Sequence, residues 1–235
     1  MVDIDTNLKL YKEAYEEEKY KEALEYLIPL AEEGNSEAQC YLGKMYSYGY
    51  GVKENDKTAV KWYMLAAKKG YIRAQYDLAN AYADGLGVKK NYKTAVKWYK
   101  LTAEKDMHQQ AWTNIEGEDL LEYTTLAKFK LGEWYYHGGK VKQDYEIALK
   151  WFMLADKDSS NFSDKKDVYE ASRWAQYYLG KMYKKGHGVE QNYITAAKWF
   201  RISSEKIYKY DNLVWLRYVE TNPGYDEAQY ELGKM

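Results

Sequence analysis

An internal repeat constrains the fold of this chain more than any other feature. Each copy begins with Ala, followed by Leu four residues later, a small residue directly after the Leu, and Tyr three residues after that. Because positions i, i+4 and i+8 share one face of an α-helix, these residues predict one buried stripe on a first helix. Four copies align without gaps, at residues 38–66, 74–102, 127–155 and 175–203.

The small residue after the Leu, which we call the anchor, should let a neighbouring helix approach closely. The anchors are Gly43, Ala79, Gly132 and Gly180. A glycine turn follows in each copy and predicts the end of the first helix, because glycine readily adopts the left-handed backbone found there. In three copies this turn has two glycines with one residue between them. The third copy departs from the pattern, because its two glycines are adjacent in Gly138-Gly139-Lys140-Val141.

A second helix is predicted after each turn. An Asn or Asp stands where its N-cap is expected, as Asn55, Asn91, Asp144 and Asn192. The helix then carries Ala, Trp and a small residue at i, i+3 and i+7, which we interpret as its core face. The Trp follows the anchor by 19 residues in every copy, as from Gly43 to Trp62. Each copy is therefore predicted to be a helix–turn–helix unit.

This repeat resembles the Sel1-like repeat, a relative of the tetratricopeptide repeat. The resemblance rests on three motifs in order: Ala-Gln-x-x-Leu-Gly-x-x-Tyr, Gly-x-Gly-Val, and Ala-x-x-Trp-Tyr/Phe-x-x-Ala. It implies an all-α fold, a right-handed α-solenoid of antiparallel helix pairs with insertions between repeats. It also implies an adaptor role, because Sel1-like proteins resemble scaffolds for other proteins rather than enzymes.

We expect a single repeat domain over residues 1–235. Its expected units are 7–34 (closer to a tetratricopeptide unit), 36–70, 73–106, 126–157, 174–205 and a partial unit at 226–235. The spacing from anchor to Trp is constant, so every insertion must fall between a second helix and the next first helix. These insertions, at about 107–123, 158–171 and 206–225, are interpreted as helices lengthened by one or more turns. Either they bind a partner or they only pack on each other.

Composition excludes several classes of function. The formal net charge is −1, so no overall basic field attracts nucleic acid. Cys40 is the only cysteine, so no intramolecular disulfide can form. No apolar run reaches the length of a membrane span, and the acidic N-terminus does not resemble a signal peptide. We expect a cytoplasmic protein, or a periplasmic or secreted one if a signal peptide has been removed.

The sequence offers no chemistry that predicts an enzyme. His108, His137 and His187 lack partners at metal-ligand spacing, and we interpret the two in glycine turns as solvent-exposed. The glycine turns follow helices rather than strands, and no nucleotide-binding or nucleophile-elbow motif occurs. We therefore expect no catalytic residue, no metal and no cofactor.

The candidate binding residues lie on the first helices, opposite the Leu of the buried stripe. In tetratricopeptide-like arrays this face lines the concave groove, so the resemblance implies a groove with Tyr and Phe, edged by Lys. Such a groove suits an extended peptide, because Tyr offers rigid apolar area and Lys reaches carboxylates. Cys40 falls on the same face. The predicted partner-binding residues are Lys44, Tyr48, Tyr76, Asn80, Phe129, Glu133, Tyr136, Tyr177, Lys181, Lys184 and Tyr230.

Alternatives remain open at the level of sequence. The aromatic side chains can be packing residues between repeats, and the lysines can be a solvated face. The leading hypothesis is a non-catalytic scaffold that binds a protein or peptide partner in the groove or on the inserted arms. A protein that self-assembles through its terminal repeats is the second hypothesis, and a small-ligand-binding or hydrolytic enzyme is the third.

Overall fold

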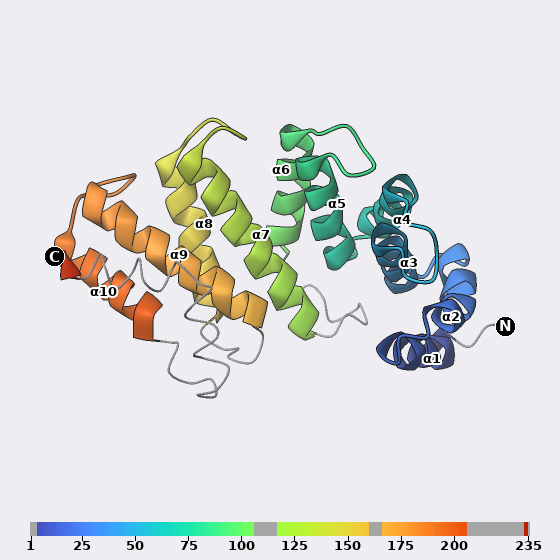
Figure 1. Ribbon diagram of the computed structural model, residues 1–235. Coiled ribbons are helices and arrows are strands. Elements are labelled where there is room, and N and C mark those ends of the chain that lie inside the picture. The colour runs from blue at the N-terminus through green and yellow to red at the C-terminus, as the bar shows by residue number, and fades with distance from the viewer. Residues whose placement is uncertain (1–3, 106–116, 160–165, 206–232, 235) are drawn as a thin grey trace. The chain divides into compact units, whose positions relative to one another are not determined.

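The computed structural model describes residues 4–105, 117–159, 166–205 and 233–234. Within these ranges the chain forms ten α-helices and no β-strand (Figure 1). The helices are α1 (Ile4–Glu16), α2 (Tyr20–Glu32), α3 (Ser36–Tyr48), α4 (Asp56–Lys68), α5 (Ile72–Asp84), α6 (Tyr92–Ala103), α7 (Gly117–His137), α8 (Tyr145–Ser159), α9 (Lys166–Lys185) and α10 (Tyr193–Glu205). The predicted all-α helical-repeat solenoid is confirmed.

The chain divides into two compact units. Unit 1 spans residues 1–109 and contains α1 to α6, and unit 2 spans residues 110–235 and contains α7 to α10. In each unit, consecutive helices pack against one another, and in unit 2 the first helices α7 and α9 are also in contact. The division between the units falls within the first expected insertion.

The insertions lengthen first helices, where the structure describes them. α7 has 21 residues and α9 has 20, against 13 in α3 and in α5. The extra residues lie at the N-terminal ends, at 117–124 in α7 and 166–172 in α9. The insertion at 206–225 lies outside the described residues, and so does the partial repeat at 226–235 apart from residues 233 and 234.

The predicted helix caps are present in all four copies. The Asn55 and Asn91 side chains each accept a hydrogen bond from the backbone N–H three residues later, both at 3.0 Å. Asp144 does the same at 3.0 Å and Asn192 at 2.8 Å. The N–H of each cap residue also donates to the carbonyl of the repeat Tyr, as from Asn55 to Tyr46 at 2.8 Å. This second bond closes the turn between the two helices of a unit.

The anchor glycines seat an aromatic ring of the second helix. A methyl group at Gly43 would lie 2.7 Å from the Tyr63 ring, and one at Gly180 would lie 2.5 Å from the Phe200 ring. These rings are almost completely buried, whereas the Trp that precedes each of them is less so in three copies. The Trp still belongs to the predicted core face, because Trp62 packs against the core cluster that contains Leu42 of its own unit's first helix, and Trp151 is only 3% exposed.

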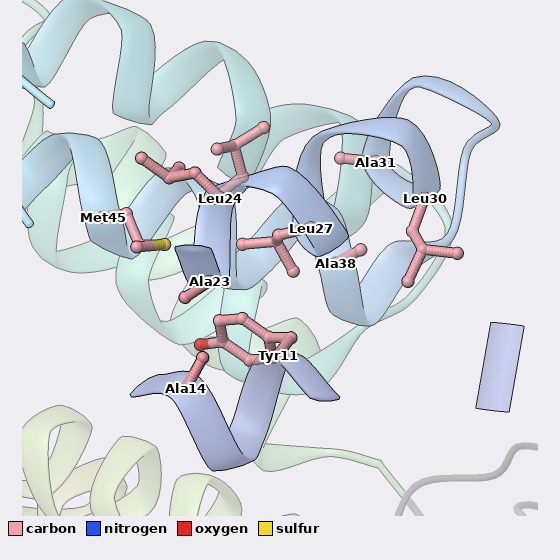
Figure 2. Packing of buried hydrophobic residues seen from close by; sticks show 10 residues of the cluster. Tyr11, Ala14, Ala23, Leu24, Leu27, Leu30, Ala31, Ala38 and Met45 are labelled. Atoms are coloured by element: carbon pink, nitrogen blue, oxygen red, sulfur yellow. The ribbon is translucent and has the colours of Figure 1, made fainter. Parts of the chain in front are cut away.

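The core of unit 1 is built from small and aliphatic side chains on the inner faces of the helices. Figure 2 shows Ala23 and Leu27 of α2 beside Tyr11 of α1 and Met45 of α3. All four are at most 1% exposed. Complete burial of a Leu such as Leu27 contributes about 1.5–3 kcal/mol relative to an exposed position. None of the described helices combines the length and apolar character needed to cross a lipid bilayer.

Candidate binding surface on the first helices

The first helices of unit 1 are joined by side-chain contacts on one face, which we call the first-helix face. The Lys44 ammonium of α3 lies over the Tyr15 ring of α1, 5.4 Å from its centre. Arg73 of α5 lies over the Tyr41 ring of α3 at 4.9 Å. Since a cation over an aromatic ring is attracted by the electron density of the ring face, these contacts fix the cations across neighbouring repeats.

A pocket of about 140 Å³ opens on this face between α3, α4 and α5. Three of the predicted binding residues, Lys44, Tyr48 and Asn80, line it. Tyr48 and Leu86, two large side chains that are 62% and 48% exposed, also belong to its wall. The remaining lining residues are Ser47, Asp56, Ala59, Val60, Tyr63, Arg73, Asp77 and Ala81. The pocket therefore joins exposed apolar area to a group of charged side chains.

Asp77 is the acidic centre of this charged group. Its carboxylate lies 4.0 Å from the Arg73 guanidinium nitrogen Nε and 4.0 Å from the Cys40 sulfur. About a quarter of the Asp77 side chain stays accessible, yet burial of the carboxyl raises its pKa to about 6, against the opposing charges of Arg73 and Lys44. Burial also lowers the pKa of Lys44, and the neighbouring Arg73 charge adds to that effect.

Cys40 does not belong to the accessible surface. It is completely buried, although its position on the helix had placed it on the groove face. Burial raises the pKa of its thiol, and the Asp77 carboxylate raises it further. A buried thiol with a raised pKa stays protonated at neutral pH, so Cys40 is not poised as a nucleophile.

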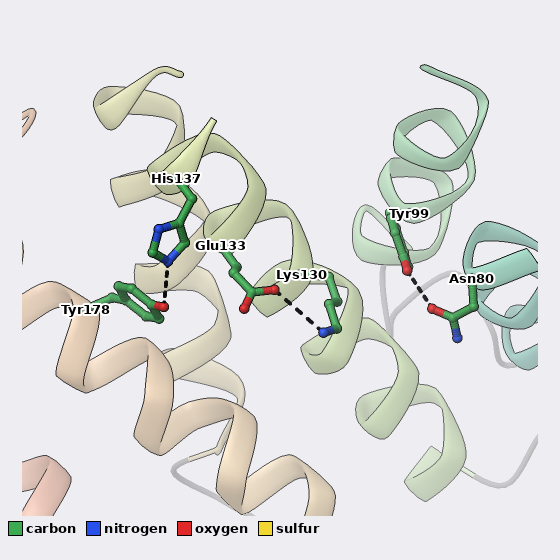
Figure 3. A network of polar contacts seen from close by, with 6 residues as sticks. All are labelled: Asn80, Tyr99, Lys130, Glu133, His137 and Tyr178. Carbon is green, nitrogen blue, oxygen red and sulfur yellow. Dashed lines mark hydrogen bonds and ion pairs between the residues drawn. The ribbon is translucent and has the colours of Figure 1, made fainter. Parts of the chain in front are cut away.

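The remaining predicted residue of unit 1, Tyr76, is partly buried and does not line the pocket. The Tyr76 ring lies 5.7 Å from the Tyr99 ring of α6. Tyr99 also donates its hydroxyl to the Asn80 carbonyl oxygen at 2.5 Å, as Figure 3 shows. Asn80 is thus held in place by the second helix of its own repeat, and Tyr76 offers only part of its ring to a partner.

In unit 2 the predicted aromatic residues lie mostly inside. Tyr136 and Tyr177 are only 6% and 5% exposed, and Phe129 packs 6.1 Å from the Phe152 ring. Lys181 covers three rings, lying 5.9 Å from Tyr136, 5.2 Å from Tyr177 and 5.6 Å from Tyr178. The rings therefore pack with neighbouring helices, and a partner would meet Lys181 before it met Tyr136 or Tyr177.

The remaining predicted residues of unit 2 are polar and partly exposed. Glu133 pairs with Lys130 on its own helix at 3.6 Å (Figure 3). The backbone carbonyl of Lys184 accepts a hydrogen bond from the Gln191 side chain at 2.8 Å. Tyr230 lies outside the described residues.

The two turn histidines take part in the same aromatic cluster. The His137 ring nitrogen Nε2 is 2.8 Å from the Tyr178 hydroxyl (Figure 3). The His187 ring stacks on Tyr145 with 4.1 Å between centres, and it is only partly exposed, unlike our expectation for a turn residue. Burial lowers the pKa of His187, and the nearby charges of Lys185 and Lys181 add to this. Among the described residues, no group of His, Cys, Asp and Glu could hold a metal ion.

Sequence reasoning missed Arg73 and Asp77. Both lie on the first helix of the second repeat, six and two residues before the anchor. The residue two before the anchor is not fixed by the repeat, since it is Tyr41, Asp77, Lys130 and Tyr178 in the four copies. That variation was the available signal, since a position that the fold does not fix can carry chemistry specific to one repeat.

Comparison with known proteins agrees with this architecture. A family model described as the Sel1 repeat matches residues 36–71, 72–107, 125–155 and 175–207, which together make up more than half of the chain. No curated protein matches. The chain is similar to a crystal structure of a Sel1 repeat protein from Oxalobacter formigenes, with a TM-score of 0.59 and 26% identity over 86% of this chain and 49% of that one.

A second crystal structure shares the fold. It is that of a protective antigen present in uropathogenic Escherichia coli strains, described as displaying an SLR fold, with a TM-score of 0.56 and 23% identity. The match covers 98% of this chain and 56% of that one. The chain thus spans about half the length of both solved relatives. On the evidence of its four matched repeats, this chain belongs to the Sel1 repeat family.

Proposed function

We propose that this protein is a non-catalytic scaffold that holds a peptide or protein partner on the first-helix face of unit 1. Sel1 repeat proteins generally mediate protein–protein interactions, and the Sel1 repeat fold is typically a non-catalytic scaffold. The observation that carries the proposal is the pocket between α3, α4 and α5, where exposed Tyr48 and Leu86 adjoin Lys44, Arg73 and Asp77.

The size of the pocket suits one side chain of a partner. An apolar cavity of about 150 Å³ holds a molecule the size of benzene, and this pocket has about 140 Å³. An apolar side chain that enters between Tyr48 and Leu86 would remove their exposed area from water. Lys44 and Arg73 are cations within the same wall and would attract carboxylates of that segment.

Some residues of unit 2 are proposed as additional partner-binding residues. Lys181 is the accessible group above the rings of Tyr136, Tyr177 and Tyr178, and Glu133 is also partly exposed. The inserted segments extend the first helices α7 and α9 of the same unit, and Lys166 and Asp167 at the start of α9 are exposed. Tyr136 and Tyr177 are buried, so they hold Lys181 in place and do not contact a partner directly.

Site-specific photocrosslinking tests the proposal. A photoreactive phenylalanine analogue replaces Tyr48 in one variant and, as a matched control, exposed Glu25 on the second helix α2 in another. We expect the first variant to give a defined adduct with a partner protein in lysate from the source cells, and the control to give none. Equal adducts from both positions would refute binding on this face, and a crosslinked dimer of the chain would favour self-assembly instead.

A purified partner then allows a quantitative test. Tyr48→Ala combined with Lys44→Glu should weaken binding by about 2–4 kcal/mol, the loss typical of one hot-spot residue and its charged neighbour. Far-ultraviolet circular dichroism checks that the variant is folded, since Tyr48 is mostly exposed but Lys44 is partly buried. An unaltered affinity in this folded variant would remove the pocket from the binding site.

A further inference from the structure

The second helices carry an aliphatic residue that recurs in every copy without being buried. It stands three residues after the repeat Trp, as Leu65, Leu101, Leu154 and Ile202. Leu65 is 45% exposed, Leu101 is 50% exposed and Ile202 is 38% exposed, while Leu154 is partly buried. This position contributes little to the core, so the fold gives no reason for a large apolar side chain there.

On α4 this aliphatic residue lies among exposed lysines. Lys57 and Lys61 precede Leu65 by eight and four residues, and Lys68 follows it by three. These spacings place all four side chains on one face of the helix. The three lysines are exposed, so α4 presents a basic face around one Leu.

The face of α6 repeats the arrangement. Lys93 and Lys97 precede Leu101 by eight and four residues, and both are exposed. Exposed Glu104 stands where α4 has Lys68. The two helices therefore present the same order of charge and apolar area along their axes, with one acidic residue at the end of the second.

α4 and α6 lie next to each other within unit 1. Trp98 of α6 packs against the core cluster that contains Ala59 and Val60 of α4. The Lys105 ammonium, just beyond α6, lies close to Gly70, just beyond α4. These contacts place the two basic faces on neighbouring helices. We call them together the Lys–Leu face: Lys57, Lys61, Leu65, Lys68, Lys93, Lys97 and Leu101.

The Lys–Leu face is positively charged, whereas the chain as a whole has a formal net charge of −1. In the described part of the chain, none of its five lysines forms an ion pair. The corresponding positions on α2 include exposed Glu25 and Glu32, so the basic surface does not continue from α4 onto α2. A cluster of unpaired like charges creates a local positive potential that attracts acidic groups.

We propose that the Lys–Leu face binds an acidic, amphipathic segment of a partner protein. Carboxylates of that segment meet the lysines, and its apolar side chains cover Leu65 and Leu101. A lipid surface fits less well, because an interfacial helix buries a broad apolar stripe and each helix here exposes a single aliphatic residue within its basic face. This site lies on second helices, whereas the pocket of the proposed function opens on the first-helix face, so each can be tested without the other.

Leu65 and Leu101 each stand among lysines, so a complementary probe is an amphipathic helix with an apolar stripe between acidic residues. The probe is a fluorescent synthetic helix with Leu at every seventh position and Glu on both sides of the Leu stripe. A second peptide with Lys in place of every Glu is its control. Binding to the full chain is followed by fluorescence anisotropy at two salt concentrations.

We expect the acidic peptide to bind more weakly at high salt and the basic peptide not to bind. Lys61→Glu with Lys97→Glu should weaken binding at least about tenfold, and Leu65→Gln with Leu101→Gln by about tenfold, since both the charges and the apolar area contribute. Charge reversal at exposed Lys142 and Lys185 of unit 2 is the matched control and should change the affinity less than about twofold. Tyr48→Ala should also leave binding of this peptide unchanged.

Three results would overturn the proposal. They are the absence of binding by the wild-type chain, equal binding of the acidic and basic peptides, and equal loss in the Lys61/Lys97 variant and the Lys142/Lys185 control. Flotation with vesicles of phosphatidylglycerol and phosphatidylcholine is measured in parallel. Capture by these vesicles without binding of the peptide would assign the surface to lipid and refute a protein partner.

Discussion

The turn after α3 offers a sharp test of how neighbouring repeats are joined, because it contains two glycines in the same backbone conformation. Gly49 and Gly51 both have φ of 70°. A methyl group on Gly49 would meet its nearest neighbours at 3.5 Å, an ordinary contact. A methyl group on Gly51 would lie 2.8 Å from the backbone carbonyl oxygen of Tyr20, at the start of α2. Only Gly51 is therefore required by the approach of another repeat.

The two alanine substitutions separate these costs. Each should lose about 1–2 kcal/mol, because a residue with a Cβ is disfavoured in the left-handed region. Gly51→Ala should lower the free energy of unfolding by about 1–3 kcal/mol more, the usual cost of forcing atoms into a filled space. The cost applies here because the backbone carbonyl of Tyr20 cannot rotate away as a side chain can. We therefore expect Gly51→Ala to cost about 2–5 kcal/mol in total, against about 1–2 kcal/mol for Gly49→Ala.

Native-state hydrogen exchange of the unit 1 amides measures both values. This method reports the opening free energy of α2 and α3 directly, without assuming that the two units unfold together. The wild-type chain and both variants are compared at the same temperature and pH. Equal destabilisation by Gly49→Ala and Gly51→Ala would refute the reasoning, since it would mean that the contact with α2 contributes nothing.

Three further outcomes follow from local features of unit 1. Asn91→Ala should lower the free energy of unfolding by about 1 kcal/mol, the usual worth of an N-cap, in urea titrations in which Lys89→Ala serves as an exposed control. Because burial raises the pKa of Asp77 to about 6, above its ordinary 3.8, the folded chain binds the extra proton between these values. This carboxyl therefore makes stability fall as the pH rises from about 4 to about 6, and Asp77→Asn should flatten that fall in melting temperatures measured across the range. Tyr48→Ala alone should leave the melting temperature of the chain within about 2 °C, because a mostly exposed residue contributes little to folding.

Much of the fold could be predicted because its determinants recur. The Ala and Leu of the stripe are buried in every copy, and all four predicted caps form. The predicted core face of the second helix is confirmed at its Ala and small residues, but it is wider than predicted, because the aromatic residue after the Trp is also buried in every copy. Gly43 leaves room for the Tyr63 ring, and Trp62 packs against the cluster of α1, α2 and α3.

The binding face was harder to predict for a physical reason. A helical wheel treats one helix alone, so the side opposite the Leu is expected to face water. Other helices pack against part of that side and bury it, as α10 does for Tyr177 and as α4 and α5 do for Cys40, while Tyr48 stays exposed. Exposure on this face therefore depends on packing between helices, which a wheel of one helix does not describe. Arg73 and Asp77 escaped notice because they occur in one copy only.

Recurrence and burial together separate the residues that build this fold from those available for binding. A residue that recurs and is buried, such as Leu42, is explained by packing. A residue that occurs once and lines a pocket, such as Asp77, gives one repeat its own chemistry. Leu65 and Leu101 belong to neither group, because they recur and yet remain about half exposed. Packing against a partner would explain both properties at once, since the two leucines occupy the same position of neighbouring repeats and would meet the partner in the same way.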